Sequence, residues 1–341
     1  VLQINMNTDK QNLAAALSLL DDLLHHPKFD AAEFDKEVQS MKAGYEANKS
    51  EPQTVAQIRL GKLSTPYPKG HPLYTNDADE SLAEINNIKL DDVKKYYAEY
   101  YGANNSTSVF VGQLDQPKIT GFLNSSLGKW NAKMAYKRLE PKYFDVAGTT
   151  ESVNTPDKTN AVLMGSINLN ISQQHADYPA VFMADNLLGG GAFLSSRIPQ
   201  RLREKEGMSY GAGTYMGLQY KYNVGTWGVY AFYNPLYQGR IDTALHEEIE
   251  KAKTAGFTQE ELTNAVKAYL EGNKTTLGVN GAVANLIQQY MRDDRDLTQY
   301  TDFENKVKAL DLNKVNDALK KYFNTSKLIL IFSGDFKKKA F

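Results

Sequence analysis

The chain has 341 residues, and its 39 Lys and Arg residues nearly balance its 40 Asp and Glu residues, for a formal net charge of −1. This length predicts about two domains, and the balance of charge disfavours nucleic acid as a partner, because proteins that bind phosphates usually carry a basic excess. Cysteine is absent, which excludes a disulfide scaffold, a thiol nucleophile and a thiolate metal site. No apolar run reaches the roughly 18 residues that a membrane-spanning helix needs, so we expect no membrane span and a soluble protein.

The first part of the chain predicts helices followed by one strand. Four leucines recur at i, i+4, i+7 and i+11, the apolar stripe of an amphipathic helix: Leu13, Leu17, Leu20 and Leu24. Further helices are predicted over residues 33–48 and 91–101, and the second of these leads into a short apolar strand over 108–111.

The rest of the chain alternates strands and helices after a polar stretch. Residues 133–157 contain two prolines and are interpreted as a linker. Strands are predicted over residues 161–167, 209–218, 225–233 and 328–332. Helices are predicted over residues 178–188, 193–204, 259–273 and 313–323. This mixture indicates the α+β class, with helices layered on a sheet.

The two parts of the chain resemble one another, which indicates an internal repeat. The offset that pairs Phe29 with Phe257 also pairs Val1 with Val229 and Gly44 with Gly272. With a few residues of insertion, Gly112 pairs with Gly334 in the same way. Because Val1 already matches Val229, the first copy lacks roughly 80 residues at its start. We therefore predict two homologous domains: residues 1–137 form the C-terminal part of the first, truncated one, and residues 138–341 form a complete second one.

The spacing of the histidines does not indicate a metal site. There are five of them: His25, His26, His71, His175 and His246. None pairs with another at a spacing typical of metal ligands. Structural or solvated roles are predicted for all five.

The run Gly189-Gly190-Gly191 suggests a phosphate-binding loop, because glycines before a helix let backbone N–H groups approach an anion. However, no Lys-Ser/Thr pair follows it, and no strand with G-x-G-x-x-G precedes it. A tight turn between two packed helices is the preferred interpretation.

The densest candidate segment is SSRIPQRLREKEGMSY at residues 195–210. A solvated helix face is one interpretation of so many charges. Alternatively, an Arg fork and a nearby phenol are suited to a peptide carbonyl that becomes an oxyanion, because both donate hydrogen bonds without changing protonation state.

This segment resembles the Arg/Tyr segment of the inverzincin metallopeptidases, the family of pitrilysin, insulin-degrading enzyme and mitochondrial processing peptidase. The motifs that carry the resemblance are LGGG at 188–191, SRI at 196–198 and LREKEGMSY at 202–210. The helix after Phe29 and the sequence VFVG at 109–112 also match the family pattern. The resemblance covers nearly the whole chain.

The resemblance implies a fold of homologous α+β domains that pair into two halves around a closed chamber. One half holds zinc through His-x-x-Glu-His and a distal Glu, and the other half contributes an Arg and a Tyr seven positions apart. Carried over, Arg203 and Tyr210 would hold the substrate backbone and stabilise the carbonyl oxygen of the scissile bond.

The distal acidic pair of the zinc-binding half is incomplete here. Glu37 matches its first position, but the second, seven residues on, is Gly44, which has no ligand atom. The resemblance therefore implies that this chain comes from the half without zinc and binds no metal itself.

Two functions are considered. The first is the non-zinc half of a zinc-dependent endopeptidase, inactive alone, whose partners are a peptide substrate and a zinc-bearing half on the same chain or a separate subunit. The alternative is a catalytically inactive homologue that serves as a binding or scaffold subunit. The sequence leaves the compartment open, and among the alternatives we favour the bacterial periplasm.

Overall fold

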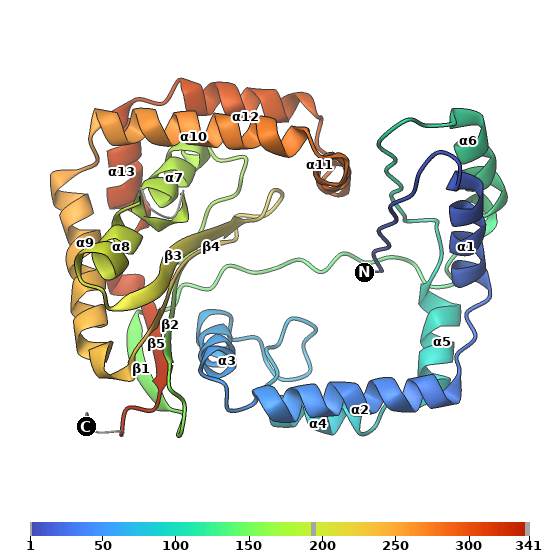
Figure 1. Cartoon of the computed structure of the whole chain (residues 1–341), viewed down its shortest axis with the longest axis horizontal. Helices are drawn as coiled ribbons and strands as arrows, with labels where there is room; N and C mark the ends of the chain where they lie inside the picture. The colour runs from blue at the N-terminus through green and yellow to red at the C-terminus, as the bar shows by residue number, and fades with distance from the viewer. Residues whose placement is uncertain (1, 192–195, 338–341) are drawn as a thin grey trace. The chain divides into compact units, whose positions relative to one another are not determined.

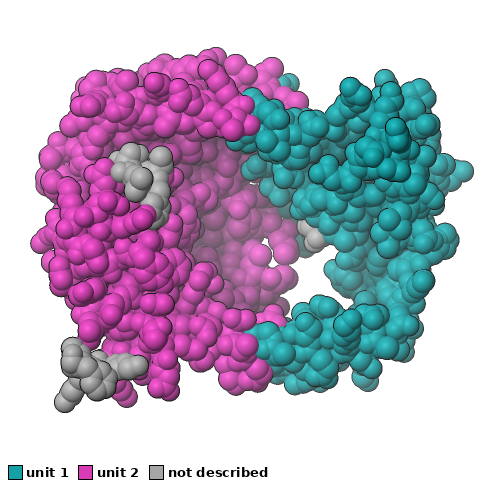
Figure 2. Space-filling view, in the orientation of Figure 1, with its two compact units in different colours: residues 1–44, 82–138, 276–296 teal, residues 45–81, 139–275, 297–341 magenta. Residues whose placement is uncertain are grey.

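The computed structural model describes residues 2–191 and 196–337. The chain divides into two compact units, each assembled from several segments (Figure 2). Unit 1 comprises residues 1–44, 82–138 and 276–296, and unit 2 comprises residues 45–81, 139–275 and 297–341. Among the described residues, no helix is both long enough and apolar enough to cross a membrane.

Unit 2 is built around a five-stranded sheet with the order β1-β5-β2-β4-β3. The strands are β1 (Thr149–Asn154), β2 (Ala161–Leu169), β3 (Ser209–Leu218), β4 (Gly225–Tyr233) and β5 (Ile329–Gly334). β1 pairs with β5 in parallel, and the other three pairings are antiparallel. The predicted α+β class is confirmed.

Helices cover both faces of this sheet. In Figure 1, α3 (Pro52–Ser64) lies on the opposite side of the sheet from the other helices of unit 2. These are α7 (Tyr178–Asp185), the turn α8 (Arg197–Pro199), α9 (Gln238–Ala255), α10 (Gln259–Leu277), α12 (Thr298–Lys308) and α13 (Leu312–Tyr322). Short helical segments complete the unit: the π-helices η2 (Asn186–Gly190) and η3 (Gln200–Lys205), and the 3₁₀-helices η4 (Pro235–Tyr237) and η5 (Thr325–Lys327).

Two apolar layers hold the sheet in place. The larger lies between the sheet and helices α7, α8, α9, α10, α12 and α13, and it buries Trp227 and Phe323 completely. The smaller joins Leu60 of α3 to Ile329 and Ile331 of β5. Because both of its faces are covered, all six residues of β5 are buried, and the strand is an apolar run without polar alternation.

Among the described residues of unit 1, the regular elements are helices. These are α1 (Leu13–His25), most of α2 (Ala31–Asn48), α5 (Leu90–Tyr100), α6 (Gln116–Ser125), the 3₁₀-helix η1 (Leu127–Lys129) and α11 (Asn280–Arg292). The helix α4 (Ala78–Ile85) begins in unit 2 and ends in unit 1. The strand predicted over residues 108–111 is wrong, because that segment is not in a strand. An extended segment becomes a strand only when a neighbour pairs with its backbone N–H and C=O groups.

Three other predicted elements differ from the structure. The predicted linker over residues 133–157 contains β1, whose polar residues hid it. The helix predicted over 178–188 changes to a π-helix after Asp185. Of the helix predicted over 193–204, residues 193–195 lie outside the described residues, and the remainder is α8 followed by η3.

Some helix lengths recur along the chain at the spacing of the predicted internal repeat. The offset that pairs Phe29 with Phe257 also brings α3 onto α11, and both helices have 13 residues. Likewise, α5 and α13 both have 11 residues. However, α3 belongs to unit 2 and α11 to unit 1. The compact units are defined by contacts, whereas the predicted domains are defined by sequence similarity. The units therefore do not test the boundary between residues 137 and 138, which remains a prediction.

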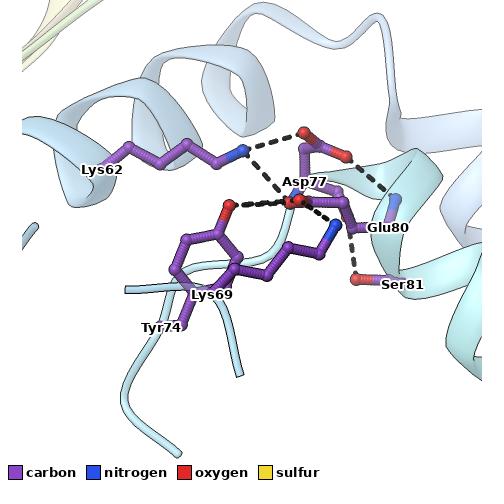
Figure 3. A network of polar contacts seen from close by, with 6 residues as sticks. All are labelled: Lys62, Lys69, Tyr74, Asp77, Glu80 and Ser81. Carbon is purple, nitrogen blue, oxygen red and sulfur yellow. Dashed lines mark hydrogen bonds and ion pairs between the residues drawn. The ribbon is translucent and has the colours of Figure 1, made fainter. Parts of the chain in front are cut away.

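A polar network fixes the start of α4 to α3 (Figure 3). The carboxylate of Glu80 accepts hydrogen bonds from the Lys69 ammonium at 2.8 Å, the Lys62 ammonium at 3.1 Å and the Tyr74 hydroxyl at 3.1 Å. Asp77 accepts from Lys62 at 2.8 Å. The bond from Lys69 is the main reason why the pKa of Glu80 lies well below its usual value, and Lys62 lowers the pKa of Asp77.

We expect this network to make stability depend on pH. A carboxylate whose pKa is lowered by folding stabilises the fold above its unfolded pKa of about 4.3, and the contribution disappears as the pH falls. Glu80→Gln should therefore lower the free energy of unfolding at pH 7, and the gap to the wild type should shrink near pH 3. Urea titrations at both pH values measure this.

A matched control is Glu271→Gln, which changes an exposed carboxylate on α10. It should leave the free energy of unfolding unchanged at pH 7. A gap for Glu80→Gln that stays constant between pH 7 and pH 3 would mean that shape, not charge, gives Glu80 its effect.

Candidate functional site

Arg203 lies at the end of the π-helix η3, close to the start of β3. Leu202, its neighbour in the helix, is fully buried and anchors this turn to the core. Gly207 ends the helix with φ at +59°, a conformation that favours glycine. The Arg203 side chain is 43% exposed, and its Nε lies 3.6 Å from a carboxylate oxygen of Glu204. The guanidinium therefore reaches the surface from a firmly held backbone.

The other two arginines of the segment are held in structural ion pairs. Arg197 donates to both carboxylate oxygens of Glu261 at 2.9 Å and lies over the Phe257 ring. Arg201 donates to Glu206 and to Glu247. Because two charged hydrogen bonds fix each guanidinium in place, bidentate at Arg197 and to two carboxylates at Arg201, these two arginines serve to hold the helix.

Tyr210 occupies a β-bulge on the edge strand β3. Ser209 pairs with Tyr233 and Gly211 pairs with Phe232, so Tyr210 is the extra residue between them. The Ser209 hydroxyl fixes the bulge, since it donates to the Phe232 carbonyl at 2.7 Å. The Tyr210 ring stacks on the Phe232 ring, with centroids 5.9 Å apart, yet the residue is 59% exposed. A bulge of this kind re-aims a side chain at the rim of a sheet.

A buried carboxyl supports the turn and strands around this site. Asp185 is 5% exposed, and one of its oxygens accepts hydrogen bonds from the Thr214 hydroxyl at 2.6 Å and the Trp227 indole at 2.9 Å. Burial raises the pKa of Asp185 to about 6. These bonds tie the end of α7 to β3 and β4. This role of Asp185 was not identified from the sequence. The one signal in the sequence is an acidic residue in an otherwise apolar helix.

The glycine run is explained by close approach to this carboxyl. A Cβ added at Gly190 would lie 2.4 Å from Asp185 Oδ2, and one at Gly189 would lie 2.7 Å from Thr214 Cγ2. Side chains at these positions would therefore clash. Tight packing accounts for both glycines without a bound phosphate.

The histidines make local contacts. His25 contacts the Ser126 hydroxyl at 3.2 Å, His26 lies 3.3 Å from Asp22, and His71 stacks on Tyr67. His175 accepts from the Asp177 amide at 3.0 Å, and His246 lies 3.1 Å from Asp242. Within residues 2–191 and 196–337, no group of three or more His, Asp or Glu side chains could hold a metal ion.

Gly44 cannot be a zinc ligand, because glycine has no side-chain ligand atom. Glu37 and Gly44 both lie on α2, and a Cβ at Gly44 would meet no atom within 4 Å. Packing therefore leaves room for an acid that the sequence does not supply. The side chains of the described residues therefore do not fit a zinc site, which the family resemblance assigns to the other half.

Two curated bacterial proteins resemble this chain along most of its length. A Helicobacter pylori protein named non-peptidase homolog YmxG is 24% identical over 347 residues, which cover 99% of this chain and 76% of that protein. A Bacillus subtilis protein named uncharacterized zinc protease YmxG is 22% identical and covers 93% of this chain and 75% of that protein.

Solved structures share the fold. A peptidase M16 inactive domain from Pseudomonas fluorescens has a TM-score of 0.78 and 24% identity, covering 94% of this chain and 74% of that one. A protease from Helicobacter pylori has a TM-score of 0.82 and 19% identity, covering 96% and 77%. The periplasmic protease PqqL from Escherichia coli has a TM-score of 0.72 and 12% identity, covering 95% of this chain and 35% of that one.

The match to a protein family includes the candidate site. Residues 87–269 match the peptidase M16 inactive domain. This segment includes all strands except β5, the glycine run, Arg203 and Tyr210. With the resemblance to the inverzincin metallopeptidases thereby confirmed, the chain belongs to the family of the peptidase M16 inactive domain.

Proposed function

We propose that this chain is the non-zinc half of a zinc-dependent endopeptidase and that Arg203 and Tyr210 bind the substrate next to the scissile bond. The observation that carries the proposal is the bulge at Tyr210. It exposes a phenol on an edge strand while Ser209 and Phe232 hold the surrounding backbone and ring in place. Preorganised donors of this kind stabilise charge that develops on a carbonyl oxygen.

The two side chains have complementary roles in this proposal. Arg203 brings a permanent charge with several N–H donors, and Tyr210 brings one O–H donor. Both donate hydrogen bonds to the carbonyl oxygen without losing a proton. The zinc of the partner half would supply the activated water, and no residue described here takes that role.

A binding or scaffold subunit without catalysis is the second candidate. It is favoured by the likeness to the Helicobacter pylori protein that is named a non-peptidase homolog. In that case Arg203 and Tyr210 would bind a peptide or another protein without any reaction. For either function, we propose the bacterial periplasm as the compartment, in line with the fold shared with a periplasmic protease.

Complementation separates these two functions. A quenched fluorescent peptide would be incubated with the full chain alone, with a zinc-bearing M16 half from the same organism alone, and with their mixture. We expect cleavage only in the mixture, and we expect a chelator to abolish it, because effective catalysis needs both surfaces at near-attack distance.

Three outcomes would contradict the proposal. Chelator-sensitive cleavage by this chain alone would show that it has a metal site of its own. Equal cleavage by the zinc half alone and by the mixture would deny this chain a catalytic role. Binding of the peptide by the mixture without cleavage would favour the scaffold function.

A further inference from the structure

The outer face of the sheet, on the side of α3, is hollowed at two places. The smaller pocket, about 210 Å³, lies beside the first turn of α3 and is lined in part by Phe232, the ring on which Tyr210 stacks. The larger, about 470 Å³, lies further along β2 and β4. Both pockets belong to unit 2.

The larger pocket has no charged residue in its lining. Its wall from α3 and its floor from the sheet consist of Gln57, Leu60, Gly61, Ser64, Met164, Ser166, Tyr215 and Thr226. Leu60 and Met164 provide apolar surface, while hydroxyl groups provide polar atoms. A charged group that entered would lose its hydration without gaining an ion pair, at a high cost in free energy.

One hydroxyl in this pocket has no partner. Ser166 is 2% exposed, and its Oγ makes no hydrogen bond. Burying such a group unpaired is costly, and because the Oγ is itself buried, a ligand recovers that cost where a shift of neighbouring side chains lets its O–H or C=O group bind there. This points to an uncharged ligand with a polar tip.

An aromatic ring forms the side of the pocket towards β3. A Cβ at Gly228 would lie 2.0 Å from Tyr215 Cζ, so the Tyr215 ring lies directly over Gly228. Burial raises the pKa of the Tyr215 hydroxyl, although the residue as a whole is 38% exposed. Rings pack well against another ring and against a thioether such as that of Met164.

The pocket lies at a distance from Tyr210 that an extended peptide can span. Phe232, next to Tyr210, and Thr226, in the pocket, are six positions apart on β4. At about 3.4 Å per residue, this separation is about 20 Å along the strand. A peptide in extended conformation would cover it with about six residues.

We infer that the pocket between α3 and strands β2 to β4 binds a tyrosine side chain of the peptide substrate, about six residues from the bond held at Tyr210. The inference rests on the proposed function for the position of the scissile bond. The ring would pack between Met164 and Tyr215, and its hydroxyl would reach Ser166 Oγ.

Photo-crosslinking to the full chain tests the site without any need for catalysis. An extended, uncharged peptide of about twelve residues would carry p-benzoylphenylalanine at each position in turn, and mass spectrometry would locate the products. We expect crosslinks to Met164 or Leu60 from one position and crosslinks near Phe232 from a position about six residues away. Crosslinks spread evenly over the surface would overturn the inference.

Binding of a labelled peptide then tests the specificity by fluorescence anisotropy. Replacing the pocket tyrosine of the peptide by glutamate should weaken binding on the order of tenfold. In the protein, Thr226→Trp should fill the pocket and remove the preference, because strands accept aromatic residues. The matched control is Thr150→Trp on the exposed strand β1, which should change nothing.

Ser166→Ala gives a third readout. It should abolish the preference for tyrosine over phenylalanine in the peptide while leaving the melting temperature unchanged or higher, since the lost hydroxyl has no partner. Equal binding of the tyrosine and glutamate peptides, or equal effects of Thr226→Trp and Thr150→Trp, would overturn the inference. Failure of the mixture to cleave peptides would refute the proposed function and leave these binding results as they are.

Discussion

Tyr210→Phe is expected to lower kcat of the assembled peptidase by about 10²–10³, the usual effect of removing one oxyanion donor. The melting temperature should not change, because the Tyr210 side chain is exposed and phenylalanine keeps its stacking on Phe232. Single-turnover kinetics on a quenched peptide and a thermal melt measure the two quantities.

Two further variants sharpen this test. Arg203→Lys should also lower kcat, because lysine keeps the charge but loses the planar fork. Tyr222→Phe, in the turn between β3 and β4, removes a phenol outside the site and should leave kcat unchanged. Normal turnover in Tyr210→Phe, or a large fall in its melting temperature, would assign Tyr210 a structural role instead.

Asp185→Asn is expected to stabilise the protein at pH 7 by up to about 3 kcal/mol. Folding raises the pKa of Asp185 from 3.8 to about 6, and each unit corresponds to about 1.4 kcal/mol. Asparagine avoids burying the charge. Its Oδ1 can accept the same bonds, because the Thr214 and Trp227 donors meet at a single oxygen of Asp185.

The dependence on pH follows from the sign of this shift. A carboxyl whose pKa is raised by folding contributes most below its unfolded pKa, and the contribution is lost as the pH rises through about 6. The gap between Asp185→Asn and the wild type should therefore narrow from pH 7 to pH 4 in urea titrations. A gap that does not depend on pH would refute the account.

Asp185→Ala provides the comparison for the hydrogen bonds. It also removes the charge, but it leaves the Trp227 indole and the Thr214 hydroxyl without this acceptor. We expect it to be about 2–6 kcal/mol less stable than Asp185→Asn, at roughly 1–3 kcal/mol for each of the two buried groups. Equal stability of the two variants would mean that these bonds contribute nothing.

Local periodicity predicted most of the fold. Helices α2, α5 and α13 and strands β3 and β4 were found because their patterns are complete within one segment. β1 was missed because its polar residues form a strand only through pairing with β5, far along the chain. The strand predicted over residues 108–111 was wrong for the opposite reason: the segment has the composition of a strand but does not form one.

The sequence named the candidate site residues, whose role remains a proposal, but it did not give their geometry. The family resemblance singled out Arg203 and Tyr210 as candidates, whereas the bulge that exposes Tyr210 depends on the register between β3 and β4. Asp185 was missed because its partners, Thr214 and Trp227, lie on strands distant in sequence. Arg197 and Arg201 likewise could not be separated from Arg203 until their carboxylate partners were placed.

The position of α3 bears on how two copies of one unit, if the predicted repeat is real, would depend on each other. The predicted repeat assigns it to the first copy, yet Leu60 packs against Ile329 and Ile331 of β5 in unit 2. A cut between residues 137 and 138 would leave that apolar face bare to water. If the repeats arose by duplication, then the ancestral single copy needed a neighbour to cover its sheet, and fusion made that neighbour permanent.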